Sequence, residues 1–412
     1  MSSRAPYDVI IVGAGIVGLA TAWELVQRRP DARLLILDKE SRVGAHQTGH
    51  NSGVIHSGLY YRPGSLKATL TRSGHRLLTA FCEREQIPYE LSGKLVVAVR
   101  HEELSRLEQL YQNGLVNQVP DLKMVSREEM SDIEPHVRGL KAIYSPKTGI
   151  VDYRMIAARL ANRLQTAGHD LLLNHSVDRI QSNGSIRIHT AGGDTFVGAT
   201  AIVAAGIGAD RLAQRSGLRH KARMIPFRGD YLVLRPERRS LVRSLIYPVP
   251  DPRLPFLGVH FTRRIHDGSV WIGPNAVLAG SRAGYRRGAL NKRDLWDTVT
   301  FPGFWRMARQ HWRSALGEWF RDYAVGAYVA MAREYVPELS LSDVMRGPMG
   351  IRAQLVDADG GLVDDFRILP TNAALFVLNA PSPAATSSFA IARYLVESAA
   401  NAFGWKLRAK SD

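Results

Sequence analysis

A glycine-rich turn close to the start of the chain constrains the fold more than any other feature of the sequence. A short β-branched run at residues 9–12 leads directly into Gly13, Gly15 and Gly18, which have the spacing GxGxxG. A segment of helical composition follows, and a second apolar run then ends in Asp38. Strand, glycines, helix, strand and acidic residue in this order predict a βαβ unit that binds an adenine dinucleotide.

The residues of this turn have separate physical roles in such a site. Gly13 allows the tight turn, Gly15 lets the backbone approach a pyrophosphate, and Gly18 lets the helix pack closely on the strand. The helix N-terminus offers free N–H groups and a partial positive charge to the phosphates. Asp38 can accept hydrogen bonds from the ribose hydroxyls.

The dinucleotide is predicted to be FAD rather than NAD. A long irregular stretch rich in Gly, His and Ser follows Asp38, where NAD enzymes usually have a short βα repeat. Far downstream, a buried strand at residues 200–203 runs into small residues that include Ala205 and Gly206. FAD proteins use such a strand to return the chain to the side of the nucleotide.

The run HQTGHNSGVIHSGLYY at residues 46–61 is the most distinctive stretch of the chain. Together with the shorter motifs PFRG, FLGVH, GPNA, GIRAQ and NAPSPAATS, it is similar to the L-2-hydroxyglutarate oxidase/dehydrogenase family, FAD-dependent oxidoreductases of D-amino-acid oxidase type. The resemblance extends from Tyr7 to about Ala400. It implies oxidation of L-2-hydroxyglutarate to 2-oxoglutarate by hydride transfer from Cα to flavin N5, with electrons passed to a quinone or to oxygen.

The resemblance also implies an α/β fold. A Rossmann-like FAD-binding domain of the D-amino-acid oxidase/glutathione-reductase type would carry an inserted α+β substrate domain built on an antiparallel sheet. Strand-like runs at residues 93–99 and 231–234 agree with such an insertion. The expected FAD-binding domain is discontinuous and comprises residues 1–78, 149–222 and 345–412, and the substrate-binding domain comprises residues 79–148 and 223–344.

Oxidation of a 2-hydroxy acid requires a base near the hydroxyl group, and histidine accepts a proton near neutral pH. His260 is the first candidate, because it lies in a strand-like run that would face the flavin ring, and His56 is the second. A structural role stays open for either histidine.

Cations are needed to hold the carboxylates of the substrate. Arg352 stands where relatives of D-amino-acid oxidase type carry Gly-x-Arg-Pro, whose arginine holds the α-carboxylate, although Ala353 replaces the proline here. The partner of the second carboxylate is left open among four candidates, each of which could equally be a structural or surface residue: Arg228, Lys94, Arg263 and Tyr61.

His50 could either contact the flavin or be covalently joined to it. The stretch around it, TGHNSG, is similar to one in dimethylglycine dehydrogenases that carries a histidine covalently joined to the flavin. The family resembled most closely binds FAD without such a bond, so a contact with the isoalloxazine is the expectation and a covalent bond the alternative. The C-terminal run 379–388 would place a helix N-terminus near the flavin, where negative charge grows during hydride transfer.

The predicted FAD-binding residues come from all these motifs. They are Gly13, Gly15, Ile16, Val17, Gly18, Asp38, Lys39, Thr48, His50, Asn51, Ser52, Gly53, Val177, Ala205, Gly206, Arg352, Pro381, Ser382, Pro383, Ala384 and Thr386. We expect no metal site, and the lone Cys82 excludes an internal disulfide and any cysteine-based zinc or iron–sulfur site.

The positive net charge of the chain predicts an anionic partner. Its 54 Lys and Arg outnumber its 38 Asp and Glu, which leaves a formal net charge of +16. The basic residues concentrate at 286–321, where Trp305, Trp312 and Trp319 recur at helical spacing. Such a helix could lie on an anionic membrane surface, or it could pack its aromatic side on the substrate domain.

The remaining sequence features narrow the location and the partners. No stretch of 18 apolar residues and no signal peptide is found, which predicts a cytoplasmic protein, either free or peripheral on the inner face of the cell membrane. No nucleic-acid reader motif is present, so we expect no nucleic-acid partner. An enzyme of the same fold for another amino or hydroxy acid, and a non-catalytic flavin-fold assembly factor, stay open as alternatives.

Overall fold

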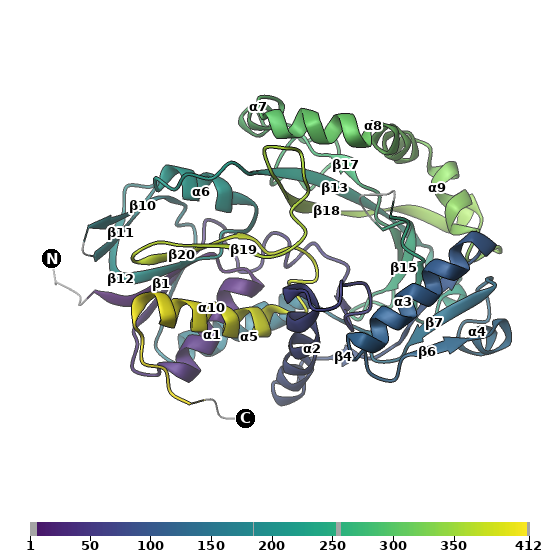
Figure 1. The fold of residues 1–412 in the computed structure, drawn as a ribbon, viewed down its shortest axis with the longest axis horizontal. Coiled ribbons are helices and arrows are strands. Elements are labelled where there is room, and N and C mark those ends of the chain that lie inside the picture. The colour runs from purple at the N-terminus through teal and green to yellow at the C-terminus, as the bar shows by residue number, and fades with distance from the viewer. Residues whose placement is uncertain (1–5, 184, 253–256, 410–412) are drawn as a thin grey trace.

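Two large β-sheets organise the molecule (Figure 1). The computed structural model describes residues 6–183, 185–252 and 257–409, so Phe256 of the FLGVH motif lies outside the described residues. The first sheet contains eight strands and carries the glycine-rich turn. Its strands are β1 (Tyr7–Val12), β2 (Leu34–Leu37), β9 (Asp170–Leu172), β10 (Val177–Asn183), β11 (Ser185–Thr190), β12 (Thr195–Val203), β19 (Arg367–Pro370) and β20 (Ala374–Asn379).

The centre of the first sheet is parallel and buried on both faces. Strand β1 pairs in parallel with β2 and β12, and every residue of β2 is buried. Helices α1 (Ile16–Arg28), α5 (Tyr153–Thr166) and α10 (Ser388–Phe403) cover one face, and α6 (Ala209–Arg215) lies on the other (Figure 1). Strands covered on both faces read as continuous apolar runs, which is the pattern at residues 9–12 and 34–37.

The register of these strands creates the ligand-binding edge. Val12 of β1 lies opposite both Leu37 of β2 and Val203 of β12, so the three strands end side by side. In open parallel sheets ligands bind at the carboxyl ends of the strands. The loops that follow all three strands are therefore brought to one place.

The second sheet contains nine strands and carries most of the predicted substrate residues. Its strands are β5 (Lys94–Ala98), β6 (Lys123–Val125), β7 (Lys141–Ser145), β13 (Arg223–Leu234), β14 (Leu245–Pro248), β15 (His260–Arg263), β16 (Val270–Gly273), β17 (Val277–Leu278) and β18 (Val344–Val356). It is antiparallel except that β5 and β14 pair in parallel. These two strands come from different segments of the chain, so no hairpin imposes an antiparallel arrangement on them.

Shorter elements complete the structure. A sheet of three short strands, β3 (Val54–Ile55), β8 (Gly149–Val151) and β4 (Tyr89–Glu90), joins the distinctive 46–61 run to other segments. Strand β18 pairs along its length with β13, so the domain boundary expected at residue 345 falls inside a strand of the second sheet. The other helices are α2 (Leu66–Arg84), α3 (Leu104–Val116), α4 (Arg127–Ile133), α7 (Lys292–Val299), α8 (Pro302–Tyr323) and α9 (Val325–Ala332).

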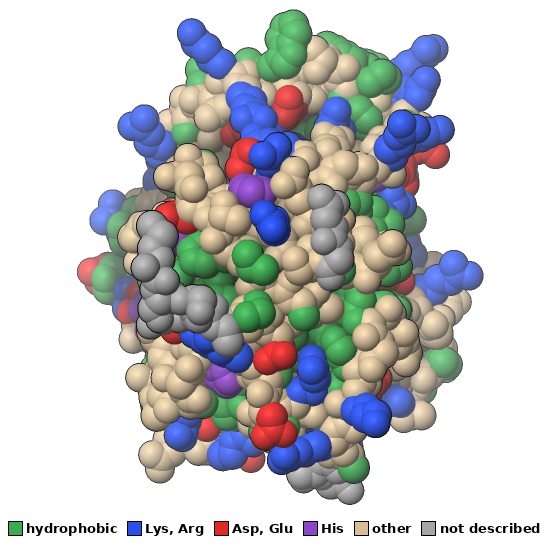
Figure 2. Space-filling view, turned by 90° about the vertical axis from the view of Figure 1, so that its left-hand side faces the viewer, with side chains coloured by type: hydrophobic (Ala, Val, Ile, Leu, Met, Phe, Trp, Pro, Cys, Tyr) green, Lys and Arg blue, Asp and Glu red, His purple; other side chains and the backbone are tan. Residues whose placement is uncertain are grey.

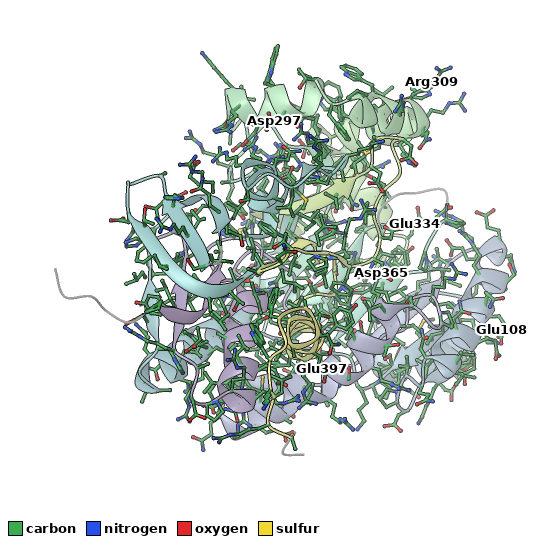
Figure 3. The ribbon with its side chains drawn as sticks, turned by 60° about the vertical axis from the view of Figure 1, so that its left-hand side comes forward. Glu108, Asp297, Arg309, Glu334, Asp365 and Glu397 are labelled. Atoms are coloured by element: carbon green, nitrogen blue, oxygen red, sulfur yellow. The ribbon has the colours of Figure 1, made fainter. Side chains whose placement is uncertain are left out.

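Helix α8 carries the predicted aromatic stripe, and the stripe faces outward. Trp305, Trp312 and Trp319 are 59%, 53% and 60% exposed, so they do not pack on the substrate domain as one of the two interpretations required. Hydrophobic and basic side chains gather at the top of the molecule, where α7 and α8 lie (Figure 2), and Arg309 projects from α8 (Figure 3). No helix within the described ranges is long and apolar enough to cross a membrane.

Candidate active site

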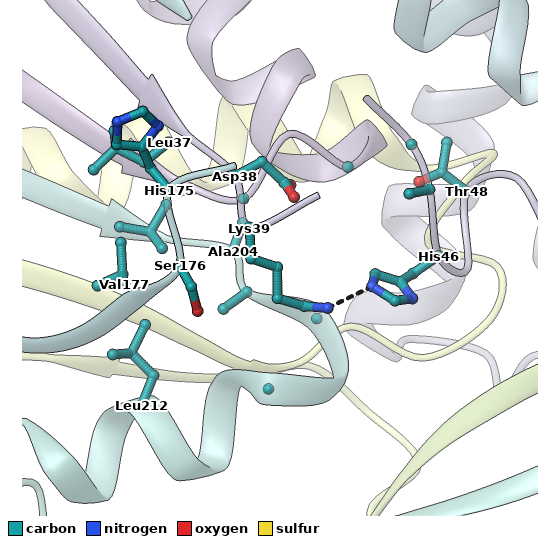
Figure 4. Close-up of a pocket in the computed structure, with 18 of the residues that line it drawn as sticks. Leu37, Asp38, Lys39, His46, Thr48, His175, Ser176, Val177, Ala204 and Leu212 are labelled. Atoms are coloured by element: carbon teal, nitrogen blue, oxygen red, sulfur yellow. Dashed lines mark hydrogen bonds between the residues drawn. The ribbon is translucent and has the colours of Figure 1, made fainter. Parts of the chain in front are cut away.

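A pocket opens at the carboxyl edge of the first sheet (Figure 4). Gly13 adopts a φ of +111°, and a Cβ atom there would lie 2.3 Å from the carbonyl oxygen of Ala204. A Cβ atom on Gly18 would lie 1.9 Å from the carbonyl oxygen of Gly13, so both positions require glycine. The predicted FAD-binding residues that line this pocket are Gly13, Gly15, Asp38, Lys39, Thr48, Val177, Ala205 and Gly206.

The polar groups of this pocket fit an adenine dinucleotide. Asp38, at the end of β2, accepts hydrogen bonds from the backbone N–H of Ala14 at 2.6 Å and of Glu40 at 2.9 Å, which fixes its carboxylate at the pocket edge. Helix α1, which includes Ile16, Val17 and Gly18, follows its N-cap Gly15, and its Ile16 N–H donates to the Thr48 hydroxyl at 3.0 Å. Its N-terminal N–H groups suit a pyrophosphate. Lys39 lies 2.7 Å from the His46 ring (Figure 4).

The loop after Thr48 is held in shape by one asparagine. The Asn51 side chain donates to the carbonyl oxygens of Gln47 and Thr48 at 3.0 and 2.7 Å, and accepts from the Gly53 N–H at 2.8 Å. Gly53 has a φ of +76°, and a Cβ atom there would lie 2.6 Å from the Arg264 guanidinium. Between these residues lies the predicted Ser52, which is partly buried.

His50 lies in the same loop, against strand β18 of the second sheet. Its ring stacks on Tyr285 with centroids 3.8 Å apart, and its Nδ1 lies 3.3 Å from the carbonyl oxygen of Met349. Burial is the main cause that lowers the pKa of His50. A Cβ atom on Gly350 would lie 2.6 Å from the His50 carbonyl oxygen, so loop and strand touch backbone to backbone.

The C-terminal run meets the 46–61 loop through a buried hydroxyl network. The Thr386 hydroxyl accepts from the His56 N–H at 3.1 Å and lies 2.9 Å from the Tyr153 hydroxyl, and both hydroxyls reach the Val54 carbonyl oxygen. The residues before it form a turn that leads into α10, whose N-terminus has no side-chain cap. That turn contains the predicted Pro381, Ser382, Pro383 and Ala384.

A group of basic side chains lies where the second sheet approaches this loop, and we call it the basic cluster: His56, Lys94, His260 and Arg352. Lys94, at the start of β5, is 0% exposed, and His260, at the start of β15, is 5% exposed. The charge of Lys94 contributes to the low pKa of both histidines, and that of Arg352 contributes at His260. Lys94 and His260 also contact the same ring, that of Tyr247, whose centroid lies 5.2 Å from the Lys94 ammonium and 4.2 Å from the His260 centroid.

Burial controls the charge of this cluster. It lowers the pKa of His56 and of His260 from 6.5 to about 3, with the neighbouring cations as further causes. It also lowers the pKa of Lys94 from 10.5 to about 7. Both imidazoles are therefore neutral at pH 7, which leaves one ring nitrogen of each unprotonated, but the low pKa makes each a weak base in the empty site.

The hydrogen bond of His260 decides which of its nitrogens can act as a base. Its Nδ1 lies 2.8 Å from the Gly258 carbonyl oxygen, which can only accept, so Nδ1 carries the proton. The neutral ring then has its lone pair on Nε2. The ring also stacks on Tyr247 with centroids 4.2 Å apart, which fixes its orientation.

Comparison with known proteins identifies the family. The family model described as FAD dependent oxidoreductase matches residues 8–398. This chain belongs to the FAD-dependent oxidoreductase family. Its fold is similar to that of FAD-bound L-alpha-glycerophosphate oxidase from Mycoplasma pneumoniae (TM-score 0.79, 24% identity, 99% and 97% of the two chains) and of glycine oxidase from Geobacillus kaustophilus (0.73, 19%, 98% and 97%). The predictions of a Rossmann-like FAD-binding fold and of FAD as the cofactor are confirmed.

Relatives with higher identity carry a common name. L-2-hydroxyglutarate dehydrogenase from Indibacter alkaliphilus is 45% identical over 96% of this chain and 100% of its own length. The human mitochondrial protein of that name is 44% identical over 96% and 89%, and the Escherichia coli protein 42% over 95% and 92%. This FAD-dependent oxidoreductase thus spans almost the whole length of those relatives.

Three of the four candidates for the second carboxylate have other contacts. The Arg228 guanidinium pairs with Asp230 at 2.8 Å and with Asp322 at 2.7 Å, which satisfies its charge inside the protein. Arg263 forms a half-exposed ion pair with Glu90 at 3.2 Å. The ring of Tyr61 faces the ammonium of Lys67, 5.5 Å from its centroid, and Tyr247 contributes to the raised pKa of its hydroxyl, so Tyr61 lies beside the basic cluster without being a cation. Lys94 is the candidate that the structure brings into the basic cluster.

The sequence interpretation missed several residues that shape this site of the oxidoreductase. Tyr247 and Tyr60 flank Lys94, Tyr153 joins the two loops, and Tyr285 stacks on His50. Tyr60 belongs to the distinctive 46–61 run, and this could have singled it out. No signal in the sequence marks the other three, because Tyr247 and Tyr153 lie in an ordinary strand and helix, and Tyr285 lies in the connection between β17 and α7.

Proposed function

We propose that this FAD-dependent oxidoreductase oxidises L-2-hydroxyglutarate to 2-oxoglutarate. The observation that carries the proposal is the basic cluster, in which the buried Lys94 and the partly buried Arg352 suit a substrate with two carboxylates. The names of relatives at 42–45% identity support the same substrate.

In the proposed mechanism Arg352 binds and orients the α-carboxylate of the substrate through its planar guanidinium. His260 takes the hydroxyl proton at Nε2, since its Nδ1 proton is held by the Gly258 carbonyl oxygen. The carboxylates of the bound substrate would favour the protonated imidazole, because they offset the charges of Lys94 and Arg352 that lower its pKa in the empty site. Bound FAD supplies the acceptor for the hydride that leaves Cα. His56 is the alternative base, and its backbone N–H is fixed by Thr386.

The FAD-binding residues assigned here divide between two regions. The residues that line the pocket at the edge of the first sheet would hold the adenine dinucleotide, and residues 50–53, Arg352 and the 381–386 turn would surround the ring system. We propose that FAD is bound without a covalent bond, because the His50 ring is already engaged by Tyr285 and Met349. Acid precipitation should then release all flavin into the supernatant, whereas flavin that stays with the pellet would favour the covalent alternative.

The test of the substrate is an anaerobic titration of the purified holoenzyme. L-2-hydroxyglutarate should bleach the flavin absorbance and yield 2-oxoglutarate, whereas D-2-hydroxyglutarate should leave the spectrum unchanged. Bleaching only by other hydroxy or amino acids would transfer the function to one of those substrates. No bleaching by any of them would favour the non-catalytic alternative.

The electron acceptor is proposed to be a quinone, with oxygen as the alternative. The outward aromatic stripe of α8 supports this choice, because a protein that lies on a membrane has access to quinones dissolved there. Steady-state turnover with a soluble quinone analogue should exceed turnover with oxygen alone, and stoichiometric hydrogen peroxide would instead favour an oxidase.

We also propose that α8 attaches the protein to an anionic membrane surface from the cytoplasmic side. Its exposed tryptophans would lie at headgroup level. Arg306, Arg309 and Arg313 are exposed on the same helix and would lie near anionic headgroups. The attachment would be peripheral and sensitive to salt, because it combines a small apolar face with screened charges.

A further inference from the structure

Lys94 is the least expected residue in the basic cluster. It starts strand β5, and its side chain is fully buried, although lysine is almost never found so in soluble proteins unless it is paired. Its ammonium lies 4.4 Å from the ring centroid of Tyr60 and 5.2 Å from that of Tyr247. Such contacts stabilise a cation only partly, because each ring supplies a weak quadrupole rather than a charge.

Among the residues that the structure describes, the groups around Lys94 offer no negative charge. Burial is the only cause that lowers its pKa, and none of its described neighbours is a carboxylate that would oppose the shift. The titratable groups that face it are Tyr60, Tyr247, His56 and His260, all neutral at pH 7. A buried cation without an anion destabilises the folded protein, and functional sites are where such groups are found.

The Tyr60 hydroxyl, on the ring that Lys94 contacts, is a second buried polar group without a bonding partner among the described residues. Buried polar groups are normally paired. An ammonium and a hydroxyl donor at the same aromatic ring make a receptor for an anion with several acceptor oxygens.

We infer that Lys94 binds the second carboxylate of the substrate, the one remote from the reacting carbon, and that it makes this enzyme specific for 2-hydroxy diacids. The inference rests on the proposed function and assigns a residue to one end of that substrate. Arg352 holds the other end, and His260 lies under the influence of both cations, as expected for a base beside the carbon between the two carboxylates.

If Lys94 holds the second carboxylate, substrate binding is coupled to the uptake of a proton by Lys94. With a pKa of about 7, Lys94 is partly neutral in the empty site at pH 7.5. A carboxylate beside it favours the charged form, so Lys94 takes up a proton as the diacid binds. Above pH 7 the affinity should then fall, by up to about tenfold per pH unit, because more protein must be protonated for binding.

The first experiment measures binding of glutarate, an unreactive diacid, to the oxidised holoenzyme by calorimetry in two buffers of different ionisation enthalpy. Wild-type protein should take up protons at pH 7.5. Lys94→Met should bind glutarate about 30- to 1,000-fold more weakly, because a buried carboxylate loses its cation, and its proton uptake should fall. Lys141→Met is the matched control, since Lys141 lies on the neighbouring strand and is exposed.

The second experiment uses turnover to test specificity. Lys94→Met should lose most of its kcat/KM for L-2-hydroxyglutarate but keep that for L-2-hydroxyvalerate, which lacks the second carboxylate, within about threefold. Lys94→Arg keeps a charge at all pH values and should bind glutarate with little pH dependence between pH 7 and 9. This variant tests the inference if the methionine variant fails to retain FAD.

Glutarate binding that is unchanged in Lys94→Met, or pH dependence that persists in Lys94→Arg, would overturn the assignment. Failure of the proposed function has a different signature. In that case L-2-hydroxyglutarate would not reduce the flavin of the wild-type protein, whereas glutarate binding and its dependence on Lys94 would still be measurable.

Discussion

Replacement of His260 by glutamine should make the protein more resistant to acid. The folded state holds the His260 imidazole neutral, with a pKa lowered from 6.5 to about 3, mainly because the ring is buried. As the pH falls below 6.5, the unfolded chain binds a proton at this position and the folded protein does not. The folded protein therefore loses stability between pH 6.5 and about pH 3.

The size of this loss of stability follows from the difference between the pKa of His260 in the unfolded and the folded protein. One pKa unit corresponds to about 1.4 kcal/mol, so His260 should lower the free energy of unfolding by about 2 kcal/mol at pH 5 relative to pH 7.5. The upper limit, reached near pH 3, is about 5 kcal/mol. His260→Gln removes the titrating group and should remove this part of the pH dependence.

Urea unfolding of the holoenzyme at pH 7.5 and pH 5 measures the difference. Wild-type protein and the variant His101→Gln, in which an exposed histidine is changed, should lose stability equally on acidification. His260→Gln should lose about 2 kcal/mol less than either. An equal loss in all three proteins would refute the reasoning, since it would mean that the imidazole is protonated inside the folded protein.

Further predictions concern other parts of the molecule. In stopped-flow experiments His260→Gln should reduce its flavin about 100-fold or more slowly with FAD still bound, because the base is lost; a normal rate would exclude His260 as the base. Arg352→Ala should raise the apparent KM for L-2-hydroxyglutarate at least about 30-fold, because a carboxylate loses its partner; an unchanged KM would argue against its role. Gly13→Ala should be purified with little FAD, because its Cβ would clash with Ala204, whereas Gly326→Ala, in open space, should keep the flavin-to-protein ratio of the wild type. In flotation assays the protein should bind anionic liposomes at low salt but not at high salt, and Trp312→Ser should weaken this binding; binding that is insensitive to both changes would contradict a role for α8.

The dinucleotide half of the site could be predicted from the sequence because its determinants are local. The conformation at Gly13, the start of α1 and the acid at the end of β2 all follow from residues within one βαβ unit. The same holds for the strands at residues 9–12 and 34–37, which the structure reproduces as β1 and β2, whereas the strand predicted at 200–203 is only the end of the longer β12 (Thr195–Val203).

The substrate half could be predicted only as an unranked set of residues. Lys94, Arg228 and Arg263 look alike in the sequence, since each is a cation in or beside a strand-like run. The structure gives Arg228 two carboxylates and Arg263 a half-exposed glutamate, and it leaves Lys94 buried among aromatic rings. Partners and burial depend on which strands become neighbours, which no local pattern specifies.

The sequence by itself determined the parallel sheet, the glycine turn and FAD, because backbone conformation and apolar periodicity act over a few residues. The tertiary structure alone decided which bases lie together and which way the tryptophans of α8 face. His56, Lys94, His260 and Arg352 come from distant parts of the chain, and their shifted pKa values arise from burial that exists only once both sheets are packed. The chemistry of this site is therefore a property of the assembled fold.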